Sequence, residues 1–197
     1  MTAGRTVNSQ SVRWCTPHKY VDAITRVLGD PIGLDPCSDE YSIIPAKTTY
    51  LLPETDGLRE SWEHPTIYVN PPYGANRQRG TTIKHWLRRC MCAHLDYDAE
   101  VLALVPIAAN TRHWKEFVWG RATALCFLYD TRLRFLEDGC DQGKGAPMAC
   151  AMIYWGNSVD HFIDVFTKFG APIDIRALHG KRLGNFEASH AAIFSEA

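Results

Sequence analysis

From Pro65 onward, short β-branched or aromatic runs alternate with segments of helical periodicity, and this alternation constrains the fold more than any other feature. We expect strands at residues 66–69, 100–106, 123–129, 148–155 and 173–177. We expect helices at residues 21–28, 81–95, 111–119 and 159–169, the last capped by Asn157 or Ser158 and ended by a left-handed Gly170. Most strand runs are almost continuously apolar, which is typical of strands buried on both faces. The pattern predicts an α/β three-layer sandwich.

Two parts of the chain interrupt this alternation. Residues 132–147 contain three glycines and a proline, so an inserted loop or hairpin is expected there instead of a helix. Before Pro65 the chain is rich in prolines, which exclude long elements and predict a loop-rich region. No repeat or linker divides the sequence. We therefore expect one domain over residues 1–197, with a flexible N-terminus at 1–13, a mobile loop at 74–80 and a C-terminal tail at 180–197.

Composition excludes several classes of protein. Of the 197 residues, 46% are hydrophobic and 22% are charged, which excludes a mostly disordered chain. The formal net charge of −1 gives no general attraction for a polyanion, so nucleic acid would need a local patch. The polar residues 1–10 and the seven scattered cysteines predict a cytoplasmic protein with reduced thiols. No run is long enough for a membrane span, and Cys90, Cys92 and His94 lack the spacing of a zinc site, so no membrane and no metal is expected.

The most informative stretch is Asn70-Pro71-Pro72-Tyr73, which directly follows the expected strand 66–69. The two prolines fix φ at about −65° and lack N–H groups, so the backbone leaves the strand in a stiff, extended form. Open α/β sheets bind ligands at the carboxyl ends of their parallel strands. The Asn70 amide oxygen and the Pro71 carbonyl oxygen are therefore expected to be two fixed acceptors, with the Tyr73 ring beside them. The alternative, a rigid strand exit without chemistry, does not account for all four residues in this order.

Two acceptors and an aromatic ring fit the exocyclic amine of a planar base. The lone pair of such an amine is delocalised into the ring, and the amine becomes nucleophilic when acceptors hold both N–H groups. In-line displacement at a sulfonium methyl group would then depend mainly on positioning and electrostatics. An amine inside a duplex is out of reach, so Tyr73 would stack on a base swung out of the helix. The stretch therefore predicts methylation of an amino group.

With these residues the chain resembles the S-adenosylmethionine-dependent amino-methyltransferases, and specifically the compact, Dam-like DNA N6-adenine methyltransferases common in phages and prophages. The resemblance covers about residues 14–155 and includes stretches at 104–114 and 132–147. It implies a Rossmann-like class I methyltransferase fold, with a mostly parallel sheet and an antiparallel edge strand. It also implies catalytic roles for Asn70, Pro71, Pro72 and Tyr73. A phage or prophage origin, the bacterial host cytoplasm and a monomer or weak homodimer are further expectations.

Three other stretches resemble the cofactor-binding elements of this family and occur in the family's order. They are Trp14 to Pro17, Leu34 to Asp39, and Asp56 to Leu58. The second contains no glycine, a shortened form of the usual Gly-x-Gly turn that the compact phage family shares. The resemblance implies S-adenosylmethionine contacts from Trp14, Thr16, Pro17, Asp35, Pro36, Cys37, Ser38, Asp56, Gly57, Leu58 and Asn70.

The near-neutral total charge conceals a basic stretch. Between His64 and Leu95 every charged residue is an arginine or a lysine. In this stretch, Arg88 and Arg89 fit a solvated helix face as well as they fit DNA. The residues expected to contact double-stranded DNA are Arg77, Arg79, Lys84, Arg112, Arg132, Arg134 and Lys144. Because the chain leaves little room for a recognition domain, we expect a short recognition site or relaxed specificity.

Two other functions remain open from the sequence. The same four residues could hold another planar amine or amide, such as RNA adenine, cytosine N4 or a protein glutamine. Alternatively, the glycine-free Asp35 element would fit a DNA-binding relative that has lost catalysis. The leading prediction is a DNA adenine N6-methyltransferase that uses S-adenosylmethionine.

Overall fold

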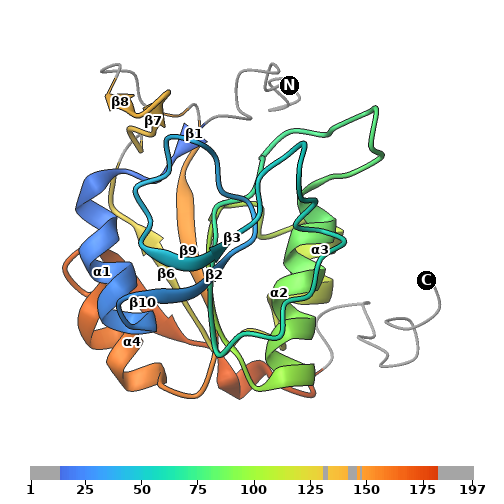
Figure 1. Cartoon of the computed structure of the whole chain (residues 1–197). Coiled ribbons are helices and arrows are strands. Elements are labelled where there is room, and N and C mark those ends of the chain that lie inside the picture. Colours follow the sequence, from blue (N-terminus) through green and yellow to red (C-terminus); the bar gives the residue numbers. More distant parts are fainter. Residues whose placement is uncertain (1–13, 131–132, 142–145, 147, 182–197) are drawn as a thin grey trace, which may run out of the picture.

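The computed structural model describes residues 14–130, 133–141, 146 and 148–181, and its centre is a seven-stranded sheet (Figure 1). The order of the strands across the sheet is β10-β6-β9-β5-β4-β2-β3. In chain order the strands are β2 (Ile32–Asp35), β3 (Ala46–Thr49), β4 (Thr66–Val69), β5 (Glu100–Pro106), β6 (Ala124–Leu128), β9 (Cys150–Trp155) and β10 (Gly170–Asp174).

Most of these strands point in one direction. Strands β3, β2, β4 and β5 are adjacent in this order and parallel to one another. Strand β9 lies antiparallel between β5 and β6, so β6 has the same direction as β5. Strand β10 pairs antiparallel with β6 at one edge. The expected mostly parallel sheet with an antiparallel edge strand is confirmed, and β9 adds a second antiparallel strand inside the sheet.

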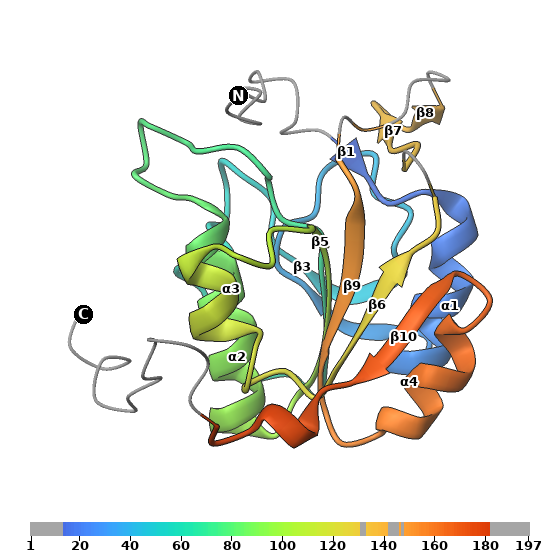
Figure 2. The same ribbon diagram turned by 180° about the vertical axis from the view of Figure 1, so that it is seen from behind.

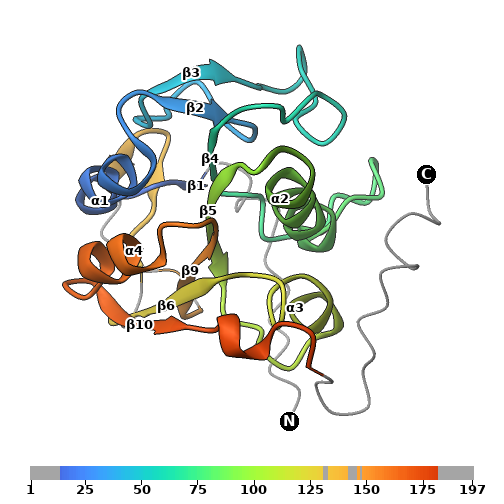
Figure 3. The same cartoon turned by 90° about the horizontal axis from the view of Figure 1, so that it is seen from below.

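Helices cover both faces of the sheet, which confirms the three-layer sandwich (Figures 2 and 3). On one face α1 (His18–Leu28) packs beside α4 (Val159–Phe166), and on the other α2 (Ile83–Tyr97) packs beside α3 (Arg112–Phe117). Apolar residues recur at helical spacing, as Tyr20, Ala23, Ile24 and Leu28 do on α1, and they are buried against the sheet. None of the helices in the described part of the chain is long and apolar enough to cross a membrane.

A small second sheet lies at the end of the molecule where the parallel strands of the large sheet terminate (Figure 1). It consists of β1 (Trp14–Cys15), β7 (Leu136–Glu137) and β8 (Cys140–Asp141), all antiparallel. The β7–β8 hairpin belongs to the segment between β6 and β9, and it pairs Trp14 with Glu137. The hairpin, which is far from β1 in the sequence, is thereby held against β1 in the fold.

The last predicted strand, at 173–177, was placed wrongly. Helix α4 ends at Phe166, β10 occupies Gly170–Asp174, and residues Arg176–Leu178 form a 3₁₀ turn. Gly170 is the first residue of β10 and does not adopt the left-handed conformation expected of it. A Cβ at this position would lie 2.1 Å from the Phe127 carbonyl oxygen, so the glycine allows close approach of two strands. Strands β2 and β3 were also missed, because the four residues of β2 (Ile32–Asp35) include a glycine and an aspartate and those of β3 (Ala46–Thr49) are mostly polar, so neither gives a continuous apolar run.

Candidate active site

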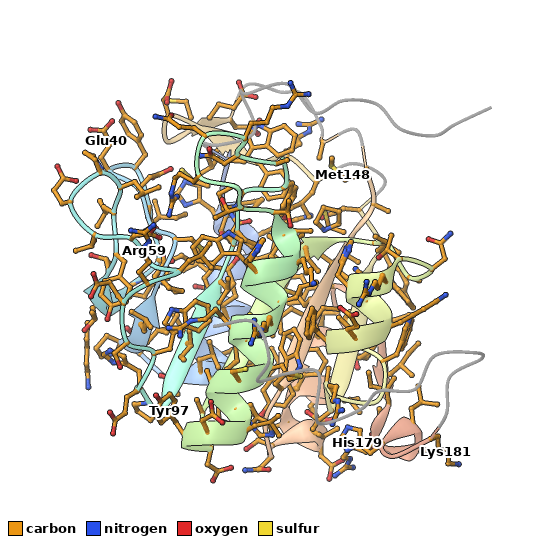
Figure 4. All side chains as sticks on the ribbon, turned by 90° about the vertical axis from the view of Figure 1, so that its right-hand side faces the viewer. Glu40, Arg59, Tyr97, Met148, His179 and Lys181 are labelled. Atoms are coloured by element: carbon orange, nitrogen blue, oxygen red, sulfur yellow. The ribbon has the colours of Figure 1, made fainter. Side chains whose placement is uncertain are left out.

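A cavity opens where β2 and β4 end, at the edge of the sheet that carries Asn70. It is lined by three stretches of chain that are far apart in the sequence. Its lining residues are Trp14, Cys15, Thr16, Asp35, Cys37, Ser38, Asp39, Ser42, Ile44, Tyr68, Asn70, Pro71 and Pro72. The structure therefore brings together most of the residues expected at the cofactor site with three of the four expected at the catalytic motif. Figure 4 shows this end of the molecule near the labelled Glu40 and Met148, with Tyr97 at the opposite end.

The Asn70 amide is held in a fixed orientation. Its Nδ2 group donates a hydrogen bond of 2.7 Å to the Trp14 carbonyl oxygen, 56 residues away in the sequence. The donor side of the amide thus points at β1, and the Oδ1 atom remains as an acceptor at the cavity. Pro71, which follows Asn70, is itself buried and lines the same cavity. Asn70 and the first proline therefore both lie at the cavity, and their roles as acceptors stay a prediction.

Tyr73 belongs to a cluster of three aromatic rings. The Trp14 and Phe135 rings stack at 5.1 Å, and Tyr73 meets them edge-on at 6.1 and 5.6 Å. The Tyr73 hydroxyl donates to the Leu104 carbonyl oxygen at 3.1 Å and lies 3.4 Å from Asn70 Oδ1. Burial raises the pKa of Tyr73 well above its ordinary value, so the phenol stays neutral. Trp14 of this cluster lines the cavity, and Tyr73 and Phe135 pack against its ring.

Phe135 was not among the expected site residues, although it lies at the centre of this cluster. The available signal was its place in the stretch Arg132 to Phe135, which resembles an element of the methyltransferase family. The position of that stretch could not be obtained from periodicity, because β7 has two residues and pairs with the distant β1.

Asp35 is a buried carboxylate in the cavity wall, with only 4% of its surface exposed. It accepts hydrogen bonds from the Cys37 backbone N–H at 3.2 Å and from Ser42 Oγ at 3.4 Å. Burial raises the pKa of Asp35 to about 6, and the hydrogen bonds counteract that effect only in part. Asp39, which accepts a hydrogen bond from the Cys15 thiol, is the other acidic residue of the lining, and the described lining contains no basic residue. The cavity therefore favours a cationic ligand.

The N-terminal stretch is anchored to the sheet below this cavity. Thr16 Oγ1 and the Tyr68 hydroxyl are both buried and lie 2.7 Å apart in a hydrogen bond. Pro17 follows as the N-cap of α1 in an extended conformation. Because Tyr68 belongs to β4, the hydrogen bond fixes the position of the Trp14 carbonyl relative to Asn70.

The stretch Asp56 to Leu58 does not line the described cavity but packs against its wall. A Cβ on Gly57 would lie 1.7 Å from the Pro36 carbonyl oxygen, so only glycine allows this contact. The Gly57 carbonyl oxygen accepts a hydrogen bond of 2.6 Å from Trp62 Nε1. The Asp35–Pro36 turn and the Asp56–Gly57 turn are therefore in direct contact. The Asp56 side chain itself pairs with Arg79.

The residues expected to contact DNA have different environments. Arg77 and Arg134 are exposed, and Lys84 lies in the first turn of α2. Burial lowers the pKa of His113 on α3, and the nearby charge of Lys84 adds a smaller contribution in the same direction. Arg112 is paired with Glu116 on the same helix. Arg132 and Lys144 lie outside the described residues.

Arg89 packs against other residues of the protein and does not lie on a solvated helix face. Its guanidinium group lies over the Trp62 ring at 4.9 Å and donates to the Glu60 carbonyl oxygen. Among the described residues, no group of three His, Cys, Asp or Glu side chains could hold a metal ion. Cys90 is buried in the core, and His94 Nδ1 lies 2.9 Å from the Ala99 carbonyl oxygen.

Comparison with known proteins agrees with this geometry. No curated protein matches the chain. The family model described as DNA N-6-adenine-methyltransferase (Dam) matches residues 3–170, a range that includes every element of the cavity and of the aromatic cluster. This match covers most of the chain and therefore shows the family. The chain belongs to the DNA N-6-adenine-methyltransferase (Dam) family.

Proposed function

We propose that this protein transfers a methyl group from S-adenosylmethionine to N6 of an adenine that has been swung out of double-stranded DNA. The family accounts for DNA adenine N6-methylation in general. The observation that carries the finer proposal is the orientation of Asn70, whose amide donates to Trp14 and keeps Oδ1 as an acceptor beside Pro71 and the aromatic cluster.

The residues around the cavity fit S-adenosylmethionine. This cofactor carries a positive sulfonium and an ammonium group, and the charged groups of the described lining are the carboxyls of Asp35 and Asp39. A nearby cation lowers the cost of ionising a buried carboxyl such as Asp35. The residues proposed to hold the cofactor are Trp14, Thr16, Asp35, Cys37, Ser38 and Asn70, supported by the Asp56–Gly57 turn. When bound, S-adenosylmethionine supplies an electrophilic methyl group.

The chain's own residues would prepare the amine for attack. Asn70 Oδ1 and the Pro71 carbonyl oxygen accept the two N–H groups of the adenine amine, which favours a tetrahedral nitrogen with an available lone pair. The nitrogen would attack the methyl group that the bound cofactor supplies, the neutral thioether S-adenosylhomocysteine would be the leaving group, and the surplus amine proton would pass to solvent. Positioning by fixed acceptors carries most of the rate enhancement in such a displacement. The neutral Tyr73 ring supports the base by stacking, with Phe135 and Trp14 packed around it.

The basic residues near the same end of the sheet would hold the DNA backbone. Arg77 in the loop after the catalytic motif, Lys84 on α2 and Arg134 before β7 come from three different segments. Contacts to phosphates position the duplex without reading its sequence. We therefore propose a short recognition site or relaxed specificity. As the family resemblance implies, we also propose a single methyltransferase domain, active in the host cytoplasm as a monomer or weak homodimer of phage or prophage origin.

The test is methyl transfer from tritiated S-adenosylmethionine to duplex DNA, single-stranded RNA and a protein extract in parallel. We expect label in the duplex, located on adenine N6 when modified bases are mapped in plasmid DNA. A duplex whose adenines already carry N6-methyl groups is the matched control and should accept no label. Preferential labelling of RNA, cytosine or protein would contradict the substrate. Failure to bind the cofactor in calorimetry would instead indicate a DNA-binding relative without catalysis.

A further inference from the structure

Two residues that belong to different ligand sites of the proposed function bind each other. Asp56 lies in the turn that supports the cofactor cavity, and Arg79 lies in the loop that follows the catalytic motif. An Arg79 Nη2 group and Asp56 Oδ2 form an ion pair. Both side chains are largely withdrawn from solvent, with 25% and 20% of their surfaces exposed. An ion pair of this kind is screened by salt much less than a fully exposed pair.

The Asp56 end of the pair is fixed to the cavity wall. Asp56 Oδ1 accepts the Leu58 backbone N–H at 3.0 Å, which sets the conformation of the turn. The neighbouring Gly57 packs directly on the Pro36 carbonyl oxygen, and its own carbonyl is held by Trp62. A displacement of Asp56 would therefore be transmitted to the turn that carries the buried Asp35.

The Arg79 end of the pair is fixed to a short hairpin. The backbones of Asn76 and Thr81 exchange hydrogen bonds of 2.9 and 3.1 Å, and the Arg79 N–H donates to Asn76 Oδ1 at 3.0 Å. This hairpin begins three residues after Tyr73 and ends just before α2. The ion pair thus connects a locally ordered, DNA-facing loop to the cofactor side of the site.

Arg79 is the principal counter-charge of Asp56. Burial raises the pKa of Asp56, but the hydrogen bond and charge of Arg79 outweigh burial and bring the pKa below its ordinary value. Arg59 also approaches Asp56, at 3.5 Å, yet 86% of its side chain is exposed, so its attraction is screened by solvent. The two cations near one carboxylate therefore provide an internal comparison.

We infer that Arg79 is a positioning residue that couples the binding of S-adenosylmethionine to the binding of DNA through its ion pair with Asp56. The inference rests on the proposed function. A ligand that orders either the turn or the hairpin also orders the other through the pair, so that the second ligand binds more tightly. By thermodynamic linkage, each ligand must raise the affinity for the other by the same factor.

The experiment measures this factor with the full chain. S-Adenosylhomocysteine, which supports no turnover, and a fluorescent adenine-containing duplex are the two probes, and each dissociation constant is measured with and without the other ligand. We expect each ligand to tighten the other roughly fivefold or more in the wild type. In Arg79→Gln and in Asp56→Asn the factor should fall close to one, and the double variant should lose no more than either single variant. Arg79→Lys should restore part of the coupling factor. The double variant Asp56→Arg with Arg79→Asp, which exchanges the two charges, should also restore part of it.

Two control variants remove the same charge from neighbouring positions. Arg77→Gln lies in the same loop but is exposed, so it should weaken DNA binding and keep the coupling factor. Arg59→Gln removes the exposed cation next to Asp56 and should also keep the factor. Thermal unfolding of each variant verifies that it is folded before binding is measured.

The outcomes separate the inference from the function on which it rests. If both probes bind and Arg79→Gln couples them as strongly as the wild type, the inference is overturned while the proposed function stands. An equal loss of coupling in Arg59→Gln would also overturn it, because the effect would then follow net charge. If the wild type binds no S-adenosylhomocysteine, both the proposed function and the inference fail.

Discussion

The cavity and the loop after the catalytic motif are built in opposite ways. In the cavity, the decisive hydrogen bonds join residues far apart in the sequence: Asn70 with Trp14, and Thr16 with Tyr68. In the 74–80 loop, the hydrogen bonds join near neighbours: the Asn76 backbone pairs with that of Thr81, and the Arg79 N–H donates to Asn76 Oδ1. The long-range contact of this loop is the ion pair of Arg79 with Asp56.

This difference indicates how each region can serve its ligand. Buried side chains that hydrogen-bond to distant residues cannot relax after a substitution. The cavity can therefore hold reacting groups in fixed positions, and substitutions in it should have large effects. A locally ordered, exposed loop can adjust to a large polyanion, and its substitutions should have small and salt-dependent effects. Substitutions in the two regions should therefore differ in size and in kind.

The largest effect is expected for Asn70→Ala. This change removes the amide acceptor at the proposed reacting nitrogen and the hydrogen bond to Trp14, so turnover should fall by about 10²–10³-fold, as when one preorganised hydrogen-bonding group is removed. Binding of S-adenosylhomocysteine should weaken much less, by a few fold, because Asn70 is only one of the residues proposed to hold the cofactor. Asn70→Asp keeps an acceptor but cannot donate to the Trp14 carbonyl, so its turnover should lie between that of the wild type and that of Asn70→Ala. Steady-state methyl transfer and calorimetry measure both quantities, and unchanged turnover in Asn70→Ala would refute the role of this residue.

A pair of glycines compares the rigidity of the two regions directly. In Gly57→Ala the new methyl group would lie 1.7 Å from the Pro36 carbonyl oxygen, so the turn must move, and we expect a loss of about 3 kcal/mol in the free energy of unfolding. In Gly80→Ala no heavy atom lies within 4 Å of the new methyl group. The cost there is the strain of an alanine at φ +64°, about 1 kcal/mol. Urea unfolding measures both values, and equal losses would show that the loop is as tightly packed as the cavity wall.

The sequence predicted the cavity better than it predicted the loop. Asn70 directly follows the predicted strand β4, so its place at the carboxyl edge of the sheet follows from the topology of an α/β fold. Thr16 and Asp35, which line the same cavity, were assigned to the site through the family resemblance. Strands β4 and β5 were predicted with their observed ends, because continuous apolar runs between turn residues leave little freedom. Short elements set by tertiary contacts, such as β1 with β7, carry no comparable local pattern.

Long-range pairing explains the other differences. Asp56 was assigned to the cofactor and Arg79 to DNA, and their contact was not predicted, because an ion pair between two turns leaves no periodic signal in the sequence. Gly170 fits the pattern of a helix end, yet the close approach of β6 determines its conformation. Phe135 joins the catalytic edge through a hairpin whose position depends on β1. In each case the missing information is which distant segment lies opposite.

The pH dependence of stability tests the buried state of Asp35. Its pKa is about 6 in the folded protein against 3.8 in an exposed carboxyl, so the folded state binds more protons between these values. The free energy of unfolding should therefore fall as the pH rises from about 4 to 6, by up to roughly 3 kcal/mol, and show no further change from this group above that window. Urea unfolding of the wild type and of Asp35→Asn across this range isolates the contribution as their difference. A difference that does not vary with pH would show that Asp35 is not a buried titrating group.

The smallest effect is expected for Arg77→Gln in the exposed loop. If Arg77 neutralises one phosphate, its loss should weaken duplex binding only a few fold and reduce the salt slope of log K by roughly 0.9. The matched control is Arg26→Gln, the same charge change on an exposed residue near the far end of α1. Fluorescence anisotropy at several salt concentrations gives both slopes. Equal slopes in the two variants would mean that the loop attracts DNA only through net charge. A lower salt slope of log K in Arg77→Gln alone would place a phosphate at the loop. The difference between the rigid cavity and the adjustable loop would then hold for ligand binding as well as for stability.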